Sequence, residues 1–293
     1  MKEPLINWNA LEEIMRPPMP PAPDKRDNGK APGRGIGGWD NQADFYNQMA
    51  QMEAGFTLNQ INCFDTDPED TVLDVGCGPG RITVPMAKRA KAVTALDASP
   101  KMLEHCRRNA EAAGLTNVTT RLFDWEDEAC MEQLEKHDIV IASRSVGMGD
   151  ISRLVKMAKK YVVLIIWSHG CPSIPMIIEE LFKGIDEGKR PGPHFSRDRR
   201  LGNNILYNRI YDMGYNPNLN VVEDGFTKDY ESRQAAYEDL IRLKPDTSGM
   251  GKDAINIFKE NTDKFLTELE DGRVRFLAPT KSIVVWFKPQ IEE

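Results

Sequence analysis

The chain has 293 residues, of which 40% are hydrophobic and 28% charged, and its formal net charge is −7 at pH 7. This length allows one large domain or one domain with a substantial insertion, and the apolar fraction is sufficient to fill its core. The acidic balance disfavours nonspecific binding of nucleic acid, which depends on Lys and Arg, and no apolar segment is long enough to suggest a membrane span.

The cysteines and histidines do not form a recognisable metal or disulfide pattern. The five cysteines are dispersed without a CxxC pair, and the four histidines lack HxxxH or HExxH spacing. We therefore expect free thiols in a reducing compartment and no metal site. The N-terminus shows no secretion signal, so the expected location is the cytoplasm.

Residues 1–38 are predicted to form a flexible arm, because residues 17–38 are dense in Pro, Gly and charge. Apolar residues at helical spacing predict a helix over Trp39–Leu58. From residue 71 the chain alternates between apolar strands and amphipathic helices, a pattern typical of a parallel sheet covered on both faces. The expected strands are Thr71–Val75, Ala92–Leu96, Val118–Phe123, Ile139–Ala142 and Tyr161–Trp167, with helices over Arg81–Lys91, Pro100–Ala113 and Ile151–Lys160.

Beyond Trp167 the alternation becomes looser. Helices are expected over Ile174–Phe182, Leu201–Met213, Tyr230–Leu243 and Ala254–Leu269, and strands over Asn218–Glu223 and Ser282–Phe287.

Three polar segments follow the first three strands. The first strand leads into Gly76, Gly78 and Gly80 and then a helix, an arrangement that lets main chain approach a ligand closely. Asp97 ends the second strand about 20 residues later, where an acid can accept hydrogen bonds from ribose hydroxyls. Asp124 and Trp125 follow the third strand and could contact an adenine. The alternatives are a tight turn for the glycines, a helix cap for Asp97 and an acidic helix start for Asp124.

The segments VLDVGCGPGR, TALDASPKML, LFDWED and DIVIASRS resemble, in order and spacing, the cofactor-binding segments of class I S-adenosylmethionine (SAM)-dependent methyltransferases. The resemblance covers roughly residues 39–167. It implies a Rossmann-like doubly wound α/β fold with a seven-stranded sheet and an antiparallel last strand, in a domain over residues 39–293. It also implies SAM as the cofactor, held by Asp74, Gly76, Cys77, Gly78, Gly80, Arg81, Asp97, Ala98, Asp124, Trp125 and Ser143.

Three other classes compete with this one. An NAD-dependent oxidoreductase usually has G-x-G-x-x-G, whereas this chain has G-x-G-x-G, and a P-loop is excluded because no GK[ST] follows the turn. A regulatory or scaffold protein that binds SAM without turnover stays open.

Few residues indicate the methyl acceptor. His169 is a candidate base, while Arg144 could orient an acidic substrate or pair with a structural acid. Cys171 is a weaker candidate nucleophile, and the basic loop Lys189–Arg200 could contact an anionic group. Trp39, Phe45 and Tyr46 are candidates for a lid over the cofactor. Insertions at about residues 168–215 and 225–275 are expected to form a substrate cap. The acidic chain favours a small-molecule acceptor, with protein or RNA as alternatives.

Overall fold

The computed structural model describes residues 5–8, 36–127, 131–168, 171–185, 203–244, 247 and 249–290. Its main elements are α2 (Ile36–Ile61), β1 (Thr71–Val75), α3 (Thr83–Ala87), β2 (Ala92–Asp97), α4 (Pro100–Ala112), β3 (Val118–Leu122), β4 (His137–Ser143), α6 (Ile151–Met157), β5 (Ala158–Trp167), α7 (Ile174–Leu181), α8 (Asn203–Asp212), β6 (Asn218–Tyr230), α9 (Arg233–Leu240), α10 (Lys252–Asp263), β7 (Leu266–Glu268) and β8 (Val274–Phe287).

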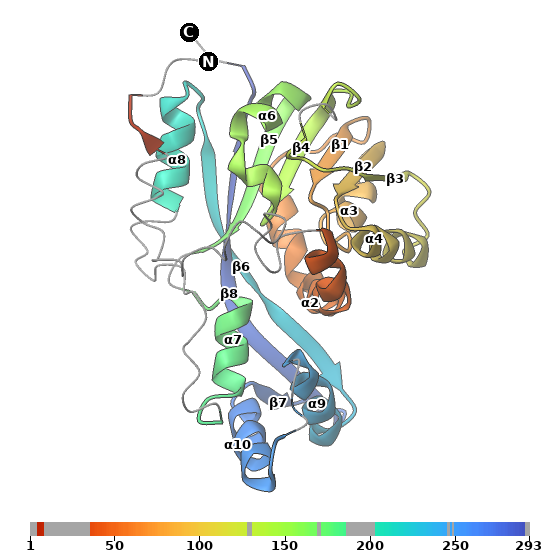
Figure 1. The fold of residues 1–293 in the computed structure, drawn as a ribbon, viewed down its shortest axis with the longest axis vertical. Helices are drawn as coiled ribbons and strands as arrows, with labels where there is room; N and C mark the ends of the chain where they lie inside the picture. Colours follow the sequence, from red (N-terminus) through yellow and green to blue (C-terminus); the bar gives the residue numbers. More distant parts are fainter. Residues whose placement is uncertain are drawn as a thin grey trace, which may run out of the picture.

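One sheet runs through the molecule in the order β3-β2-β1-β4-β5-β8-β6 (Figure 1). Strands β1 to β5 pair in parallel, whereas β8 is antiparallel to both β5 and β6. This is the doubly wound α/β fold with an antiparallel strand that the sequence predicts. The sheet has eight strands rather than seven, because the short β7 pairs with β8.

The two faces of the sheet bury alternate residues of each central strand. Leu73 and Val75 of β1 join one apolar cluster, which also contains Val140 and Leu164. Val72 lies in the cluster on the opposite side. Because both faces are covered, the central strands are mostly apolar, with Asp74 of β1 as a buried exception, and this explains why the sequence indicates them clearly.

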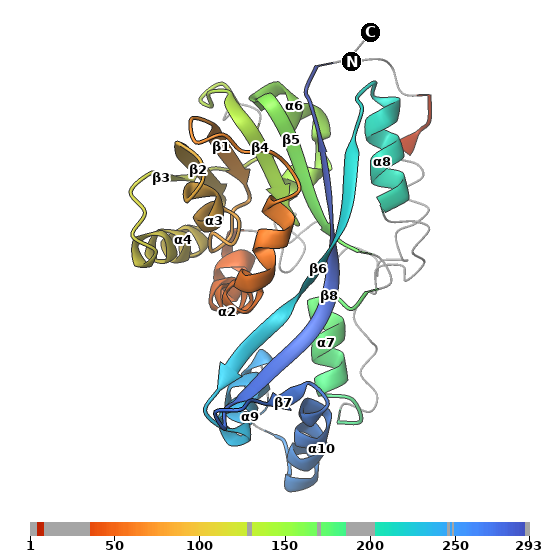
Figure 2. The same cartoon turned by 180° about the vertical axis from the view of Figure 1, so that it is seen from behind.

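Strands β6 and β8 are much longer than the sheet that they complete. They pair continuously from Asn218 opposite Trp286 to Tyr230 opposite Val274, while β5 pairs only with Ser282–Phe287 of β8. The remaining part of this two-stranded ribbon extends away from the sheet (Figures 1 and 2). Helices α7, α9 and α10, strand β7 and this end of the ribbon form what we call the outer lobe. It has its own apolar cluster, which includes Phe226, Leu240 and Phe258.

Several predicted boundaries are wrong in detail. Residues 266–268 of the expected helix Ala254–Leu269 form β7, which pairs with the start of the next strand, β8. Residues 158–160 of another expected helix begin β5. The helix expected over Arg81–Lys91 is shortened to α3, and the predicted strands Asn218–Glu223 and Ser282–Phe287 are only parts of β6 and β8.

Part of the expected N-terminal arm contacts the folded domain. The backbone N–H groups of Leu5 and Ile6 and the indole Nε1 of Trp8 donate to the Asp212 carboxylate at the end of α8. Helix α2 begins at Ile36, inside the expected arm. Residues 9–35 lie outside the described part of the chain. None of the described helices is long and apolar enough to cross a membrane.

Candidate functional site

The glycine turn after β1 presents bare main chain at one position. Gly76, Gly78 and Gly80 have φ values of +69°, +54° and +90°, which glycine adopts at little cost. A Cβ at Gly76 would lie 2.6 Å from Ser145 Cβ, and one at Gly80 would lie 2.9 Å from Cys106 Sγ, whereas a Cβ at Gly78 would meet nothing within 4 Å. Gly76 and Gly80 are therefore required by packing, and Gly78 borders open space.

Asp97 lies beside this open position. Its Oδ2 accepts from the Gly78 N–H at 2.9 Å, and its Oδ1 accepts from the Ser99 N–H at 2.9 Å. Burial raises the pKa of the Asp97 carboxyl, an effect opposed by the backbone hydrogen bonds from Ser99, Gly78 and Ala98. The structure thus brings the glycine turn and the acid of β2 into direct contact, as their spacing indicates.

Other residues of the same segment face the interior. The Asp74 carboxylate is buried and accepts from Thr83 Oγ1 at 2.6 Å, and burial raises the pKa of Asp74 to about 6. The Cys77 side chain packs in a buried cluster with Cys106. Asp74 and Cys77 therefore support the turn from behind, and their predicted contacts with a cofactor remain predictions.

The segment after β3 divides into an exposed acid and a buried ring. Asp124 is exposed, and its Oδ1 accepts from the Glu126 N–H at 3.1 Å. Trp125 is buried in the sheet core, with the Arg153 guanidinium 5.8 Å from its ring. The group that this segment leaves open to a ligand is therefore the Asp124 carboxylate.

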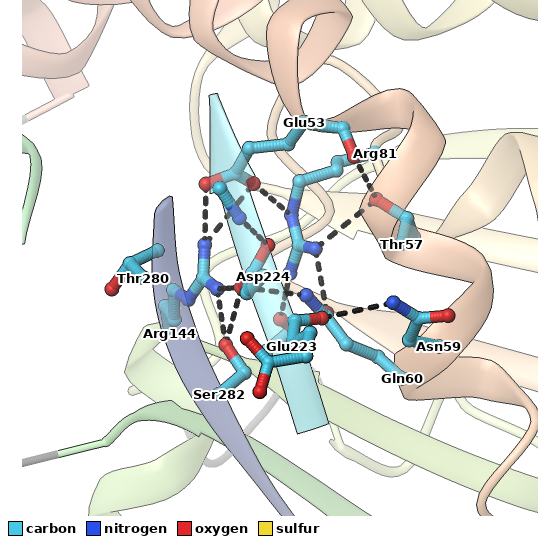
Figure 3. A network of polar contacts seen from close by, with 12 residues as sticks. Glu53, Thr57, Asn59, Gln60, Arg81, Arg144, Glu223, Asp224, Thr280 and Ser282 are labelled. Atoms are coloured by element: carbon cyan, nitrogen blue, oxygen red, sulfur yellow. Dashed lines mark hydrogen bonds and ion pairs between the residues drawn. The ribbon is translucent and has the colours of Figure 1, made fainter. Parts of the chain in front are cut away.

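A buried polar network lies between α2, the ends of β1 and β4, and the ribbon (Figure 3). Arg81, which follows the glycine turn, pairs with Glu53 at 3.1 Å and donates to Gln60 Oε1 at 2.7 Å and to Ser143 Oγ. Its guanidinium is thus largely occupied by protein groups. Arg81 and Ser143, both predicted cofactor ligands, lie together at the carboxyl end of the sheet.

Arg144 is the second cation of this network. It donates to Glu53 at 2.8 Å and to Asp224 at 2.6 Å, and its guanidinium carbon lies 3.1 Å from the centre of the Trp167 ring. Its φ of +51° is unusual for a residue with a side chain and is a sign of local backbone strain. Arg144 thus pairs with structural acids in this structure, and a catalytic role for it stays a prediction.

The acidic partners of Arg81 and Arg144, which are Glu53 and Asp224, were not predicted from the sequence. Glu53, Thr57 and Gln60 are at most 2% exposed and lie one helical turn apart, so they form a buried polar stripe on α2. The spacing of these three polar residues could have indicated a buried polar face of the helix. A search for regularly spaced apolar residues alone does not detect it. Asp224 and Ser282 lie in strands far along the chain, and no local pattern marks them.

The candidate lid residues lie on the first half of α2. Tyr46 packs edge-on against Trp39 and Phe45, with ring centres 5.8 and 5.6 Å away. This half of α2 is joined to the start of α4, where the Ser99 hydroxyl donates to Asp40 at 2.5 Å. The lid residues are therefore close to the glycine turn and Asp97, as a cover over that site requires.

The remaining predicted site residues contribute little to this geometry. His169 and the loop Lys189–Arg200 lie outside the described residues, and Cys171 is a free, half-buried cysteine. Within the described part of the chain, no group of three or more His, Cys, Asp or Glu side chains could hold a metal ion.

Parts of the chain are similar to known proteins. Residues 66–181 match the family described as Methyltransferase domain. An uncharacterized protein of Haemophilus influenzae Rd is 29% identical over 208 residues, covering 69% of this chain and 71% of that protein. The 23S rRNA (uracil(1939)-C(5))-methyltransferase RlmD of Klebsiella pneumoniae strain 342 is 33% identical over 109 residues, covering 36% of this chain and 25% of that enzyme. This chain therefore spans only about a quarter of that relative's length. The structure of a putative methyltransferase from Bacillus halodurans C-125 is 19% identical with a TM-score of 0.42, covering 80% of this chain and 97% of that chain.

A parallel sheet with a glycine turn after β1 and an acid ending β2 defines a nucleoside-binding α/β domain. A Cβ at Gly78 would enter open space beside the Asp97 carboxylate, so a ligand can approach the main chain here. Residues 66–181 therefore form a methyltransferase domain, and the cofactor that this match supports is SAM.

Proposed function

We propose that this chain transfers the methyl group of SAM to a small-molecule acceptor held between the carboxyl edge of the sheet and the outer lobe. The observation that carries the proposal is the position of Gly78 and Asp97 next to a carboxyl edge that α2 covers. In this proposal the outer lobe is the substrate cap. A covered edge favours a small acceptor over a polymer.

The apolar lining of the outer lobe supports this choice. Met49 and Met52 of α2 pack with Ile177 and Phe226, next to the Trp167 ring that stacks on Arg144. Methionine side chains adapt to irregular apolar shapes. This wall would favour an acceptor with an apolar part, and the nearby network would orient its polar end.

The chemical demand on the protein residues is mainly orientation. SAM supplies an activated methyl group, and the chain must hold the acceptor atom in line with it. Such positioning supplies about 7–11 kcal/mol in favourable cases. The turn at Gly78 and the Asp97 carboxylate fix one reactant, and the α2 lid excludes water. A base is required only if the acceptor atom arrives protonated.

Labelled SAM distinguishes the acceptor classes. The protein is incubated with methyl-labelled SAM and a cell extract, which is then separated into small-molecule, protein and RNA fractions. We expect label in the small-molecule fraction, and much less of it at a low SAM concentration with the Asp97→Ala variant as the matched control. Label in RNA would instead favour an acceptor like that named for the RlmD relatives. SAM retention without labelled product would favour the regulatory or scaffold class.

A further inference from the structure

The buried network joins three parts of the molecule that are distant in sequence. Glu53 belongs to α2, Arg81 and Arg144 to the carboxyl edge of the sheet, and Asp224 and Ser282 to the ribbon. Asp224 also accepts from Gln60 of α2 at 2.8 Å. Helix and ribbon touch directly, since a Cβ on Gly225 would lie 3.2 Å from the Phe56 ring.

Glu53 holds both cations at once. Its Oε2 lies 3.1 Å from Arg81 Nε, and its Oε1 lies 2.8 Å from Arg144 Nη1. The Glu53 side chain is 2% exposed, so water does not replace either contact. A movement of one guanidinium would therefore shift the Glu53 carboxylate and change its ion pair with the other guanidinium.

The charges in this network balance in a way that makes every member necessary. Two guanidiniums face two carboxylates, Glu53 and Asp224, and the Asp224 side chain is fully buried. Burial lowers the pKa of Arg144, and the nearby Arg81 charge acts in the same direction. Glu53 and Asp224 oppose this shift but do not reverse it. Loss of either acid would leave an uncompensated positive charge in the interior, which is strongly unfavourable.

The two cations connect to different functional parts. Arg81 directly follows Gly80, so the position of its side chain depends on the position of the glycine turn. Arg144 holds the ribbon through Asp224 at 2.6 Å and Ser282 Oγ at 2.7 Å. Glu53 joins Arg81 to Arg144 directly. Gln60 forms a second, uncharged bridge, because it accepts from Arg81 at 2.7 Å and donates to Asp224 at 2.8 Å.

We propose that Glu53 is a positioning residue that couples cofactor binding at the glycine turn to docking of the ribbon and outer lobe on the sheet. Ordering of the turn by the cofactor fixes Arg81, which fixes Glu53 against Arg144, which in turn holds Asp224. The acceptor wall is then complete only with cofactor in place. The inference rests on SAM being the cofactor and extends the proposed function to the order in which its two sites form.

The test measures binding of S-adenosylhomocysteine, the demethylated cofactor, by calorimetry in the full chain. Asp224 has no contact with the glycine turn, yet we expect Asp224→Asn to weaken binding about fivefold through Glu53. Glu53→Gln is expected to weaken binding at least as much. Adding Asp224→Asn to Glu53→Gln is expected to weaken binding less than Asp224→Asn does alone, since only the bridge through Gln60 remains. Ser282→Ala keeps every charge and serves as the mild variant if the others do not fold.

Asp229→Asn is the matched control. Asp229 lies on the same strand as Asp224 and pairs with Arg275 at 2.6 Å, but this pair is on the ribbon surface and away from α2. We expect its affinity for S-adenosylhomocysteine to equal that of the wild type. Hydrogen exchange supplies a second measurement: the ligand is expected to protect residues 218–230 in the wild type and in Asp229→Asn, but much less in Asp224→Asn.

The outcomes separate the two levels of inference. If the wild type binds S-adenosylhomocysteine, and folded Asp224→Asn and Ser282→Ala bind it equally well with unchanged protection of the ribbon, Glu53 has only a structural role and the coupling is refuted. A wild type that does not bind the ligand overturns the cofactor-based function and the coupling together.

Discussion

Substituting Gly78 and Gly80 separately by alanine distinguishes the ligand-facing glycine from the packing glycine. Both have positive φ, so each alanine costs about 1–2 kcal/mol in backbone strain. At Gly80 the new Cβ would also lie 2.9 Å from Cys106 Sγ, and such overpacking adds about 1–3 kcal/mol. At Gly78 it meets no protein atom within 4 Å and instead occupies space assigned to the cofactor.

Gly80→Ala should therefore lose more stability, and Gly78→Ala more affinity. Denaturant unfolding measures the first and calorimetry with S-adenosylhomocysteine the second. We expect Gly78→Ala to stay folded and to bind at least about tenfold more weakly, equivalent to about 1.4 kcal/mol. Wild-type affinity in folded Gly78→Ala would show that no ligand approaches the turn at this position, and the placement of the cofactor would be wrong.

Three further substitutions test other parts of the site. Asp97→Ala should weaken S-adenosylhomocysteine binding at least about tenfold while circular dichroism stays unchanged, because one charged hydrogen bond contributes about 1.5–3 kcal/mol; unchanged affinity by calorimetry would contradict the ribose assignment. Asp74 has a pKa raised from 3.8 to about 6, so its ionisation destabilises the folded state as the pH rises through this range. The unfolding free energy of Asp74→Asn, measured relative to the wild type by urea unfolding, should therefore increase by about 2 kcal/mol as the pH rises from about 4.5 to about 7.5. A difference between the two proteins that does not change with pH would refute this. Arg144→Met should lower the unfolding free energy by about 3–5 kcal/mol, because it leaves the buried Asp224 carboxylate without a cation and Glu53 with Arg81 alone, and a loss below about 1 kcal/mol would show that Asp224 finds another partner.

Strands β1, β4 and β5 are predictable because their central residues are apolar and buried on both faces, whereas β3 is a half-exposed edge strand that its β-branched residues indicate. Strands β6 and β8 were recognised only in part, since their outer halves are covered on one face. In β8, Val274, Phe276 and Ala278 are buried while the residues between them are exposed. This alternation was present in the sequence, but Arg275 and Pro279 interrupt its apolar character. Strand β7 has three residues and exists only because β8 lies beside it.

The same distinction applies to the site. The glycine turn and Asp97 lie within one strand–helix–strand unit, so their distance along the chain predicts their contact in space. Arg144 meets Ser282 across 138 positions and Asp224 across 80. Local sequence contains no information about such a meeting. The choice between substrate contact and structural pairing for Arg144 therefore needed the structure.

The proposed acceptor side should change more easily than the proposed cofactor side. In the proposed site the cofactor side depends on main-chain atoms and one carboxylate, which would tolerate few replacements. The acceptor side is assembled from α2, β4 and the ribbon, whose side chains can change in size without disturbing the glycine turn. Glu53 and Asp224 limit that freedom, because any change that moves the ribbon must still place an acid against Arg144. New acceptor specificity should therefore be easier to obtain at Met49, Met52 or Phe226 than at any charged member of the network.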